Sequence, residues 1–322
     1  MNRFYQFFVH SWAATVIAAL LCMAVWGHYI AYHTTGWTEL YPSLLNLTLY
    51  LVFGLLLNNA YGHTATGSQR ITLSSTLFFM GCAITPQIAP WQEGTICLVL
   101  MGTAYHLLSY TFRNHTSMGS YFTAFSLIGI ASLCSPKLLY ITPILILACT
   151  FMQSLHIRTS LAAILGILFP YWTAFCILYL TNNTHLISSF AAELTTSIFP
   201  TATMLHLSTG TGHSLAIPTI VLQIGWTLLL VLPAIAHIAS ATSSIETRAN
   251  RYFQIGNFGI LLITVLVLPS LRTTLLPAIL MLTAIIGYSF FVTGNKRRGR
   301  NIWALVLLVF WLFTLGLYVW NS

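Results

Sequence analysis

The sequence contains little charge, and almost none of it is negative. Charged residues make up 5% of the 322 positions, Asp is absent, and Asp and Glu together number only four. A soluble domain of this length needs many more charged residues on its surface. Because 57% of the residues are hydrophobic, the composition excludes an ordinary soluble protein and indicates a chain that is solvated by lipid.

Two common kinds of site are also missing. The six cysteines include no CxxC pair, so they are best explained as small apolar packing residues rather than as a disulfide framework or a zinc site. Ion-coupled carriers usually keep a carboxylate at membrane depth, and the apolar runs contain none. We therefore assign no metal site, no cofactor and no catalytic residue from the sequence.

Hydrophobic runs are what the chain has in abundance. A helix needs about 20 mostly apolar residues to cross roughly 30 Å of hydrocarbon with its backbone groups paired. The fifth and ninth runs are short, and must recruit flanking residues such as Met118 or Gly256. The candidate spans are Ser11–Ile30, Leu44–Ala60, Ile71–Ile88, Thr95–Phe112, Tyr121–Leu133, Leu139–Leu155, Ser160–Leu180, Ala216–Ile238, Phe258–Ser270, Thr274–Val292 and Ile302–Trp320. The sequence predicts one all-α domain over residues 1–322, a polytopic transmembrane helical bundle of about 11 spans.

The cations sort onto alternate loops of this arrangement. Lys and Arg are retained on the cytoplasmic side of short loops. With a cytoplasmic N-terminus, only Lys137 and Arg272 fall outside, as do Glu39, Glu93 and Glu193. The cations on the cytoplasmic side are Arg3, Arg70, Arg113, Arg158, Arg248, Arg251, Lys296, Arg297, Arg298 and Arg300. This predicts an extracytoplasmic C-terminus.

The stretch "GNKRRGRN", residues 294–301, is the most basic part of the chain. Its cations, Lys296, Arg297, Arg298 and Arg300, anchor the topology of the last two spans, and they also suit anionic lipid headgroups, at about 1 kcal/mol for each cation near the surface. The positive-inside bias accounts for the net charge of +8. The predicted partner is therefore the lipid bilayer and not a nucleic acid.

One connection, residues 181–215, is longer than the others and contains no Lys or Arg. Apolar residues recur at spacings of three and four between Ile187 and Phe199, which predicts an interfacial helix. This extracytoplasmic loop is either a lid over a central cavity or a plain connector. Its polar candidates match no metal motif; they are His185, Glu193, His206 and His213.

Within the spans, a few polar residues are candidates for a cavity. His106 and His237 are the titratable groups, and Gln223 is a deep polar neighbour. They fit either a proton relay through His or hydrogen bonds between helices.

Three segments carry a resemblance to known proteins. "HIRTSLAAILGILFPYW" (156–172), "ANRYFQIGNFGILLITVLVLP" (249–269) and "AIIGYSFFVTGNKRRGRNIW" (284–303) resemble an uncharacterised family of polytopic inner-membrane proteins of the Bacteroidales type. In that family an Arg at the cytoplasmic start of a span precedes small residues and a Pro-aromatic-aromatic end. The matching residues here are Arg158, Ala162, Ala163, Gly166, Pro170, Tyr171 and Trp172. The resemblance implies a multi-pass protein of the inner membrane and brings no catalytic residues.

Two classes of function fit these features. The first is a non-enzymatic carrier, flippase-like protein or assembly component with a cavity between its helices. The alternative is a membrane-embedded enzyme that acts on a lipid-linked sugar, of the glycosyltransferase, polymerase or ligase type. Such an enzyme needs a base or an Arg and His set facing outward. Its candidates are Glu39, and Arg272 with His206 and His213.

Overall fold

The computed structural model consists of helices and their connections, with no strand among its described residues, in agreement with the predicted all-α class. The structure describes residues 7–9, 11–33, 36–61, 72–90, 93–114, 116–134, 136–182, 188–189, 192, 216–240, 245–267, 272–293 and 297–321. The helices are α2 (Trp12–His33), α3 (Trp37–Tyr61), α4 (Leu73–Ile84), α5 (Glu93–Ser109), α6 (Met118–Cys134), α7 (Ile141–Ala148), α8 (Ile157–Leu180), α10 (Ala216–Ser240), α11 (Ile245–Val267), α12 (Arg272–Thr293) and α13 (Arg297–Asn321). Three 3₁₀ segments accompany them: η1 (Pro86–Ile88), η2 (Pro136–Tyr140) and η3 (Cys149–Met152).

Each of the hydrophobic runs coincides with a helical segment. The two short runs are lengthened as expected, since α6 begins at Met118 and α11 reaches back beyond Gly256 to Ile245. The sixth run differs from a continuous span, because α7 covers only Ile141–Ala148 between η2 and η3. Gln153 closes η3 in the left-handed conformation, with φ at 53°. Within the described residues, four helices are long and apolar enough to cross a membrane: Trp12–Tyr32, Leu40–Asn58, Ile157–Leu180 and Thr274–Phe291.

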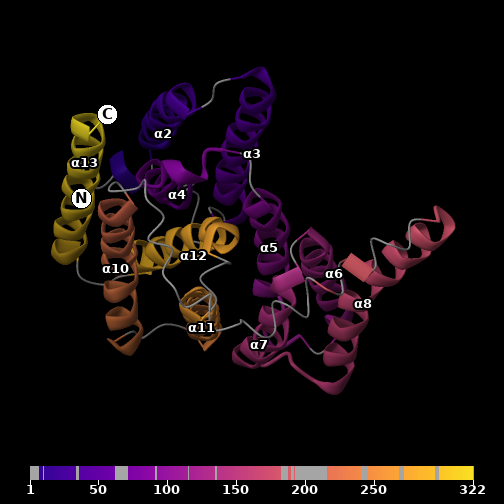
Figure 1. Cartoon of the computed structure of the whole chain (residues 1–322). Coiled ribbons are helices and arrows are strands. Elements are labelled where there is room, and N and C mark those ends of the chain that lie inside the picture. The colour runs from indigo at the N-terminus through magenta and orange to yellow at the C-terminus, as the bar shows by residue number, and fades with distance from the viewer. Residues whose placement is uncertain are drawn as a thin grey trace.

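Two helices form the centre of the bundle. All twelve residues of α4 are buried, as are 89% of those in the α12 window Thr274–Phe291. Figure 1 shows α12 between α4, α5, α10 and α11, with α8 at the edge beside α6. The core therefore lies around α4 and α12, and α8 belongs to the periphery.

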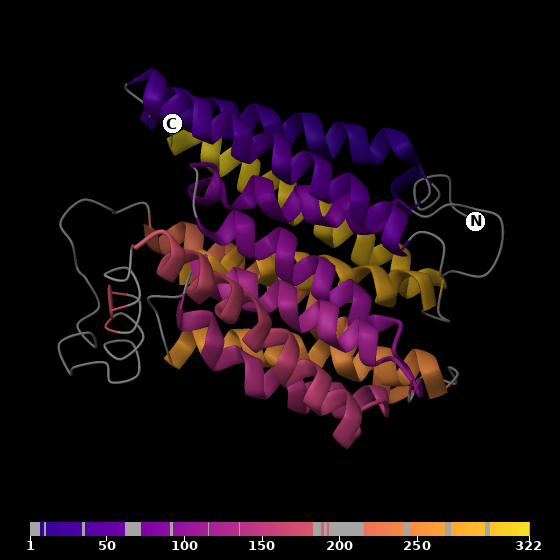
Figure 2. The same ribbon diagram turned by 90° about the vertical axis from the view of Figure 1, so that its right-hand side faces the viewer.

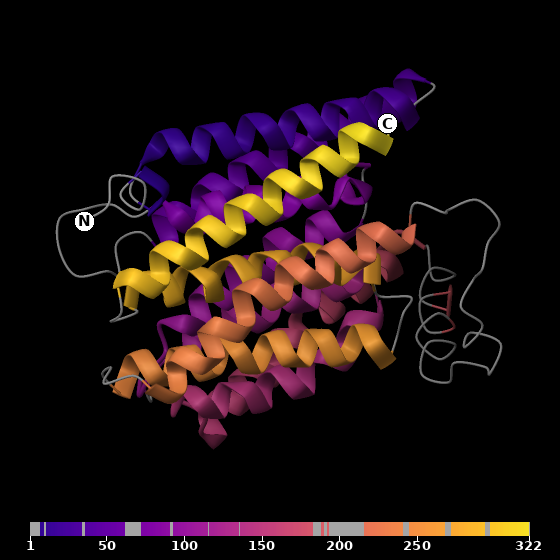
Figure 3. The same cartoon turned by 90° about the vertical axis from the view of Figure 1, so that its left-hand side faces the viewer.

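The helices lie side by side and turn back at alternate ends of the bundle. Figures 2 and 3 place the beginning of α2 and the end of α13 at opposite ends of the bundle. In Figure 3, α11 and α13 both begin at the end of the bundle where α2 begins. An all-helical arrangement of this kind, with apolar helices, is compatible with a membrane-embedded bundle.

A short buried loop joins α4 to α5, and one side chain holds it. Asn46 on α3 is fully buried, and its Nδ2 donates to the carbonyl oxygens of Ile88 (2.8 Å), Ala89 (2.9 Å) and Pro90 (3.0 Å). The Thr95 hydroxyl donates to Asn46 Oδ1. Buried carbonyls must be paired, so Asn46 makes this irregular backbone tolerable inside the bundle.

Candidate functional site

A row of amide side chains crosses the interior on α11. Asn250, Gln254 and Asn257, here called the α11 polar stripe, follow one another at spacings of four and three, which places them on one face of the helix. Gln254 is 6% exposed and Asn257 is 2% exposed. The structure therefore buries two amides and part of a third among apolar helices.

The oxygen atoms of this stripe have no hydrogen-bond donor among the described residues. They are Asn250 Oδ1, Gln254 Oε1 and Asn257 Oδ1. The amide nitrogen of Asn257 is used within the helix, because its Nδ2 donates to the carbonyl oxygen of Phe253 at 2.9 Å. A buried acceptor without a donor costs about 1–3 kcal/mol. Three such acceptors on one face indicate a surface built to receive hydrogen bonds from something other than the described chain.

The inner end of the stripe borders a small cavity where several helices meet. Its volume is about 20 Å³, and its lining includes Tyr105 of α5, Asn257 of α11 and Met281 of α12. That space accommodates about one water molecule. Tyr105 also stacks on Phe253 of α11, with ring centroids 5.2 Å apart. The polar face of α11 is thus held against α5 by an aromatic contact beside the cavity.

A buried cation stands next to the stripe. Arg251 is only 3% exposed, and Nε, Nη1 and Nη2 of its guanidinium group have no hydrogen-bond partner among the described residues. It lies in the second turn of α11, near the end of the bundle at which this helix begins. The site therefore combines the unpaired guanidinium donors of Arg251, near the beginning of α11, with the unpaired amide oxygens of the α11 polar stripe.

The intramembrane residues predicted from the sequence lie on two helices, α5 and α10. His106 on α5 is half-buried, with its ring edge against Tyr110 at 4.9 Å. Gln223 on α10 is 8% exposed, and its Nε2 has no partner among the described residues. One turn further along, Trp226 stacks on Phe310 of α13. The side chain of His237 lies outside the described residues.

Among the remaining candidates, the structure describes the side chain of Arg158 alone. Arg158 is the second residue of α8 and is exposed. Glu39, Arg272, Arg297, Arg298 and Arg300 lie on helices, but their side chains are outside the described residues. Lys296, His185, Glu193, His206 and His213 fall outside the described residues altogether, as does most of the predicted interfacial helix. Among the residues that the structure describes, no group of three or more His, Cys, Asp or Glu could hold a metal ion.

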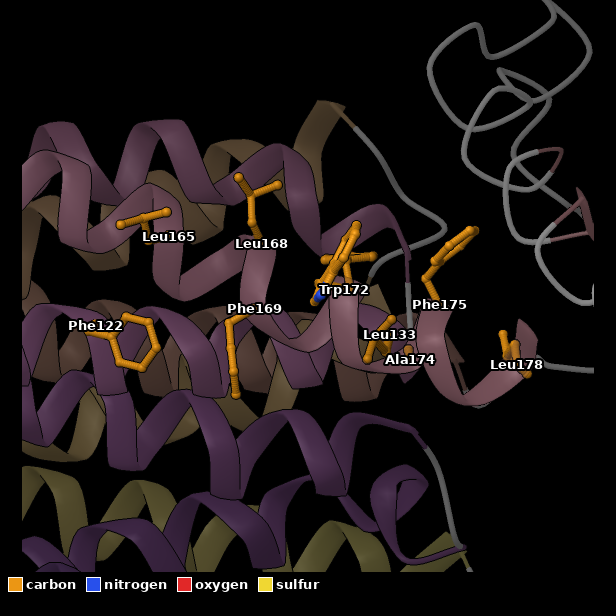
Figure 4. Close-up of a pocket in the computed structure, with 10 residues that line it drawn as sticks. Phe122, Leu133, Leu165, Leu168, Phe169, Trp172, Ala174, Phe175 and Leu178 are labelled. Atoms are coloured by element: carbon orange, nitrogen blue, oxygen red, sulfur yellow. The ribbon is translucent and has the colours of Figure 1, made fainter. Parts of the chain in front are cut away.

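A second feature is a groove on the outer face of α6 and α8. It has a volume of about 920 Å³ and is lined almost entirely by apolar side chains. Figure 4 shows Phe122 of α6 beside Phe169 of α8, with Trp172 and Phe175 further along α8. The Phe122 and Phe169 rings lie 5.7 Å apart, and the hydroxyls of Ser132 and Tyr171 share a 2.6 Å hydrogen bond. This groove has the character of a lipid-facing surface.

The sequence contains a signal for the stripe that the span prediction passed over. In "ANRYFQIGNFG", the amides recur at the spacing of one helix face. The predicted span begins only at Phe258, directly after Gly256 and Asn257, whereas the helix begins at Ile245. A search for polar residues at helical spacing, made independently of hydropathy, finds all three amides.

Comparisons with protein-family models, with curated proteins and with solved structures give no match.

Proposed function

We propose that this protein is a multi-pass inner-membrane protein of the carrier or flippase-like kind, with eleven spans, a cytoplasmic N-terminus and an extracytoplasmic C-terminus. The sorting of cations onto alternate loops supports this orientation. The beginning of α2 and the end of α13 lie at opposite ends of the bundle, which also supports an odd number of crossings.

The observation that carries the carrier function is the α11 polar stripe. A purely structural helix in lipid gains nothing from buried acceptors that lack donors, whereas a helix that lines a pathway offers them to a passing cargo. The stripe has no carboxylate, so the cargo moves past neutral amides rather than binding to a charged ion-coupling group.

Reconstitution tests the carrier function. Liposomes that contain the purified protein are prepared with fluorescent NBD-phosphatidylglycerol, and separately with radiolabelled glycerol 3-phosphate inside. External dithionite should bleach well over half of the fluorescent lipid if lipid flips, and the label should leave the liposomes if a soluble cargo is carried. Rates of lipid flipping and of label release equal to those of protein-free liposomes would refute the proposal.

Two matched variants test whether the flux depends on the α11 polar stripe. Asn257→Leu removes an unused acceptor and should abolish flux without loss of thermal stability. Thr264→Val is the control, because Thr264 lies on the same face seven residues later, but its hydroxyl already donates to the carbonyl oxygen of Ile260 at 2.8 Å. Equal flux in both variants would mean that the stripe does not line the pathway.

The orientation has its own test. A fluorescent protein that matures only in the cytoplasm is fused after Ser322, and the cells should stay dark while the fusion accumulates. Bright cells would show that an even number of spans precedes the fusion.

A further inference from the structure

The unused guanidinium of Arg251 is the strongest unexplained feature of the described structure. Taking a charge out of water is costly unless it is paired, and breaking a buried pair typically costs several kcal/mol. Arg251 is buried, and its three guanidinium nitrogens have no partner among the described residues.

The chemistry of the group points to an oxyanion. A guanidinium presents five N–H donors in a planar fork that matches the oxygens of a phosphate or carboxylate. Arg248 lies one turn before Arg251 on the same side of α11 and is exposed. A second cation therefore lies between Arg251 and the end of the bundle at which α11 begins (Figure 3).

The neighbouring hydrogen-bond acceptors narrow the chemical class of the ligand further. Gln254 is one turn beyond Arg251, and Asn250 directly precedes it; Gln254 Oε1 and Asn250 Oδ1 accept no hydrogen bond from the described residues. Inorganic phosphate carries its O–H groups only on the phosphorus itself, directly beside the oxygens that Arg251 would hold. A phosphate ester that carries hydroxyl groups offers both its anionic oxygens to Arg251 and its hydroxyls to the two amides.

We propose that Arg251, assisted by Arg248, binds the phosphate group of a hydroxylated phosphate ester, with Asn250 and Gln254 accepting hydrogen bonds from its hydroxyls. The ester is either a lipid headgroup such as phosphatidylglycerol or a small soluble phosphate such as glycerol 3-phosphate, because the two share this chemistry. The inference rests on the proposed function to the extent that it assigns a cargo to the same part of α11, but the binding is measured separately from flux.

Thermal unfolding of the detergent-solubilised full chain measures this binding. A ligand that binds only the folded protein raises Tm progressively with its concentration. Three additives are compared: glycerol 3-phosphate, inorganic phosphate, and micelles with phosphatidylglycerol in place of phosphatidylcholine. Glycerol 3-phosphate or phosphatidylglycerol should raise Tm more than inorganic phosphate does, and the more effective of the two identifies the source of the ligand. A Tm that none of them changes would overturn the proposal, without any variant being needed.

Three substitutions locate the binding. Arg251→Met should abolish the ligand-dependent rise in Tm, and should leave the ligand-free protein at least as stable as the wild type, since it removes an unpaired buried charge. Arg158→Met is the control, because Arg158 is exposed on α8 and should keep the full rise. Gln254→Leu should retain the response to inorganic phosphate but lose the preference for the hydroxylated ester. Equal rises in Arg251→Met and wild type would overturn the assignment to Arg251.

The two proposals fail in different ways. Binding that requires Arg251, without flux in liposomes, would retain the phosphate site and refute the carrier function. Flux in liposomes, without any effect of these phosphates on Tm, would retain the carrier function and refute the phosphate site.

Discussion

The central helix α4 and the peripheral helix α8 are both strongly apolar, yet they lie in opposite environments. Every residue of α4 is buried, whereas only 17% of the residues of Ile157–Leu180 in α8 are. In water, apolar composition would bury both helices. In lipid it does not, because the hydrocarbon is as apolar as the side chains, so close packing and hydrogen bonds decide which helices reach the centre.

The residues of α4 that bring it to the centre are small or hydroxylated. The Thr76 hydroxyl lies 2.9 Å from that of Thr15 on α2, and Ser74 Oγ donates to the carbonyl oxygen of Leu57 at 3.4 Å. Gly81 admits Trp226 of α10, whose Nε1 is 3.1 Å from the position of an added Cβ. Helix α8 exposes large residues such as Leu168 and Trp172 over most of its surface.

A large loss of stability is expected when Asn46, which clamps the loop after α4, is replaced. Asn46→Leu leaves the carbonyl oxygens of the η1 loop without their donor, at about 1–3 kcal/mol for each buried group. We expect a loss of about 4 kcal/mol in the free energy of unfolding, measured by denaturant titration in detergent. Thr48→Val is the control, since Thr48 is exposed and its hydroxyl donates within its own helix to Leu45. A similar loss in both variants would show that the clamp is not what holds the loop.

A smaller loss is expected where α8 does pack. Gly166→Ala places a Cβ 2.5 Å from the carbonyl oxygen of Phe122 on α6, so one backbone must move. Overpacking of this kind costs about 1–3 kcal/mol. Gly316→Ala in α13 is the control, because nothing lies within 4 Å of its added Cβ, and Ala favours a helix over Gly by about 1 kcal/mol. Opposite signs of the two changes in unfolding free energy are expected, and equal changes would argue against a tight α6–α8 contact.

These two regions also show how much of the fold could be predicted from the sequence. Length and hydropathy locate the helices, because every span in lipid must satisfy its own backbone. They do not say which helix is central, since α4 and α8 are apolar on all sides and neither has a polar face that marks the outside. The stripe was missed for the opposite reason. Polar residues and Gly256 interrupt the hydrophobic run before Phe258, so the first turns of α11 were left out of the predicted span although the helix continues through them.

The smallest effect is expected on the exposed face of α8, and it gives the sharpest test of the comparison. Leu168 is 54% exposed and Leu77 on α4 is 1% exposed. The same substitution to Ala therefore removes side-chain atoms from a fluid surface at Leu168 and from a packed core at Leu77. Leu77→Ala should cost about 2–5 kcal/mol, because a cavity remains among side chains that cannot fully close around it. Leu168→Ala should change the unfolding free energy by less than about 0.5 kcal/mol, because detergent or lipid fills the space. Denaturant titrations of both variants in the same detergent measure the difference. A loss at Leu168 as large as that at Leu77 would mean that another protein surface, and not lipid, covers the groove between α6 and α8.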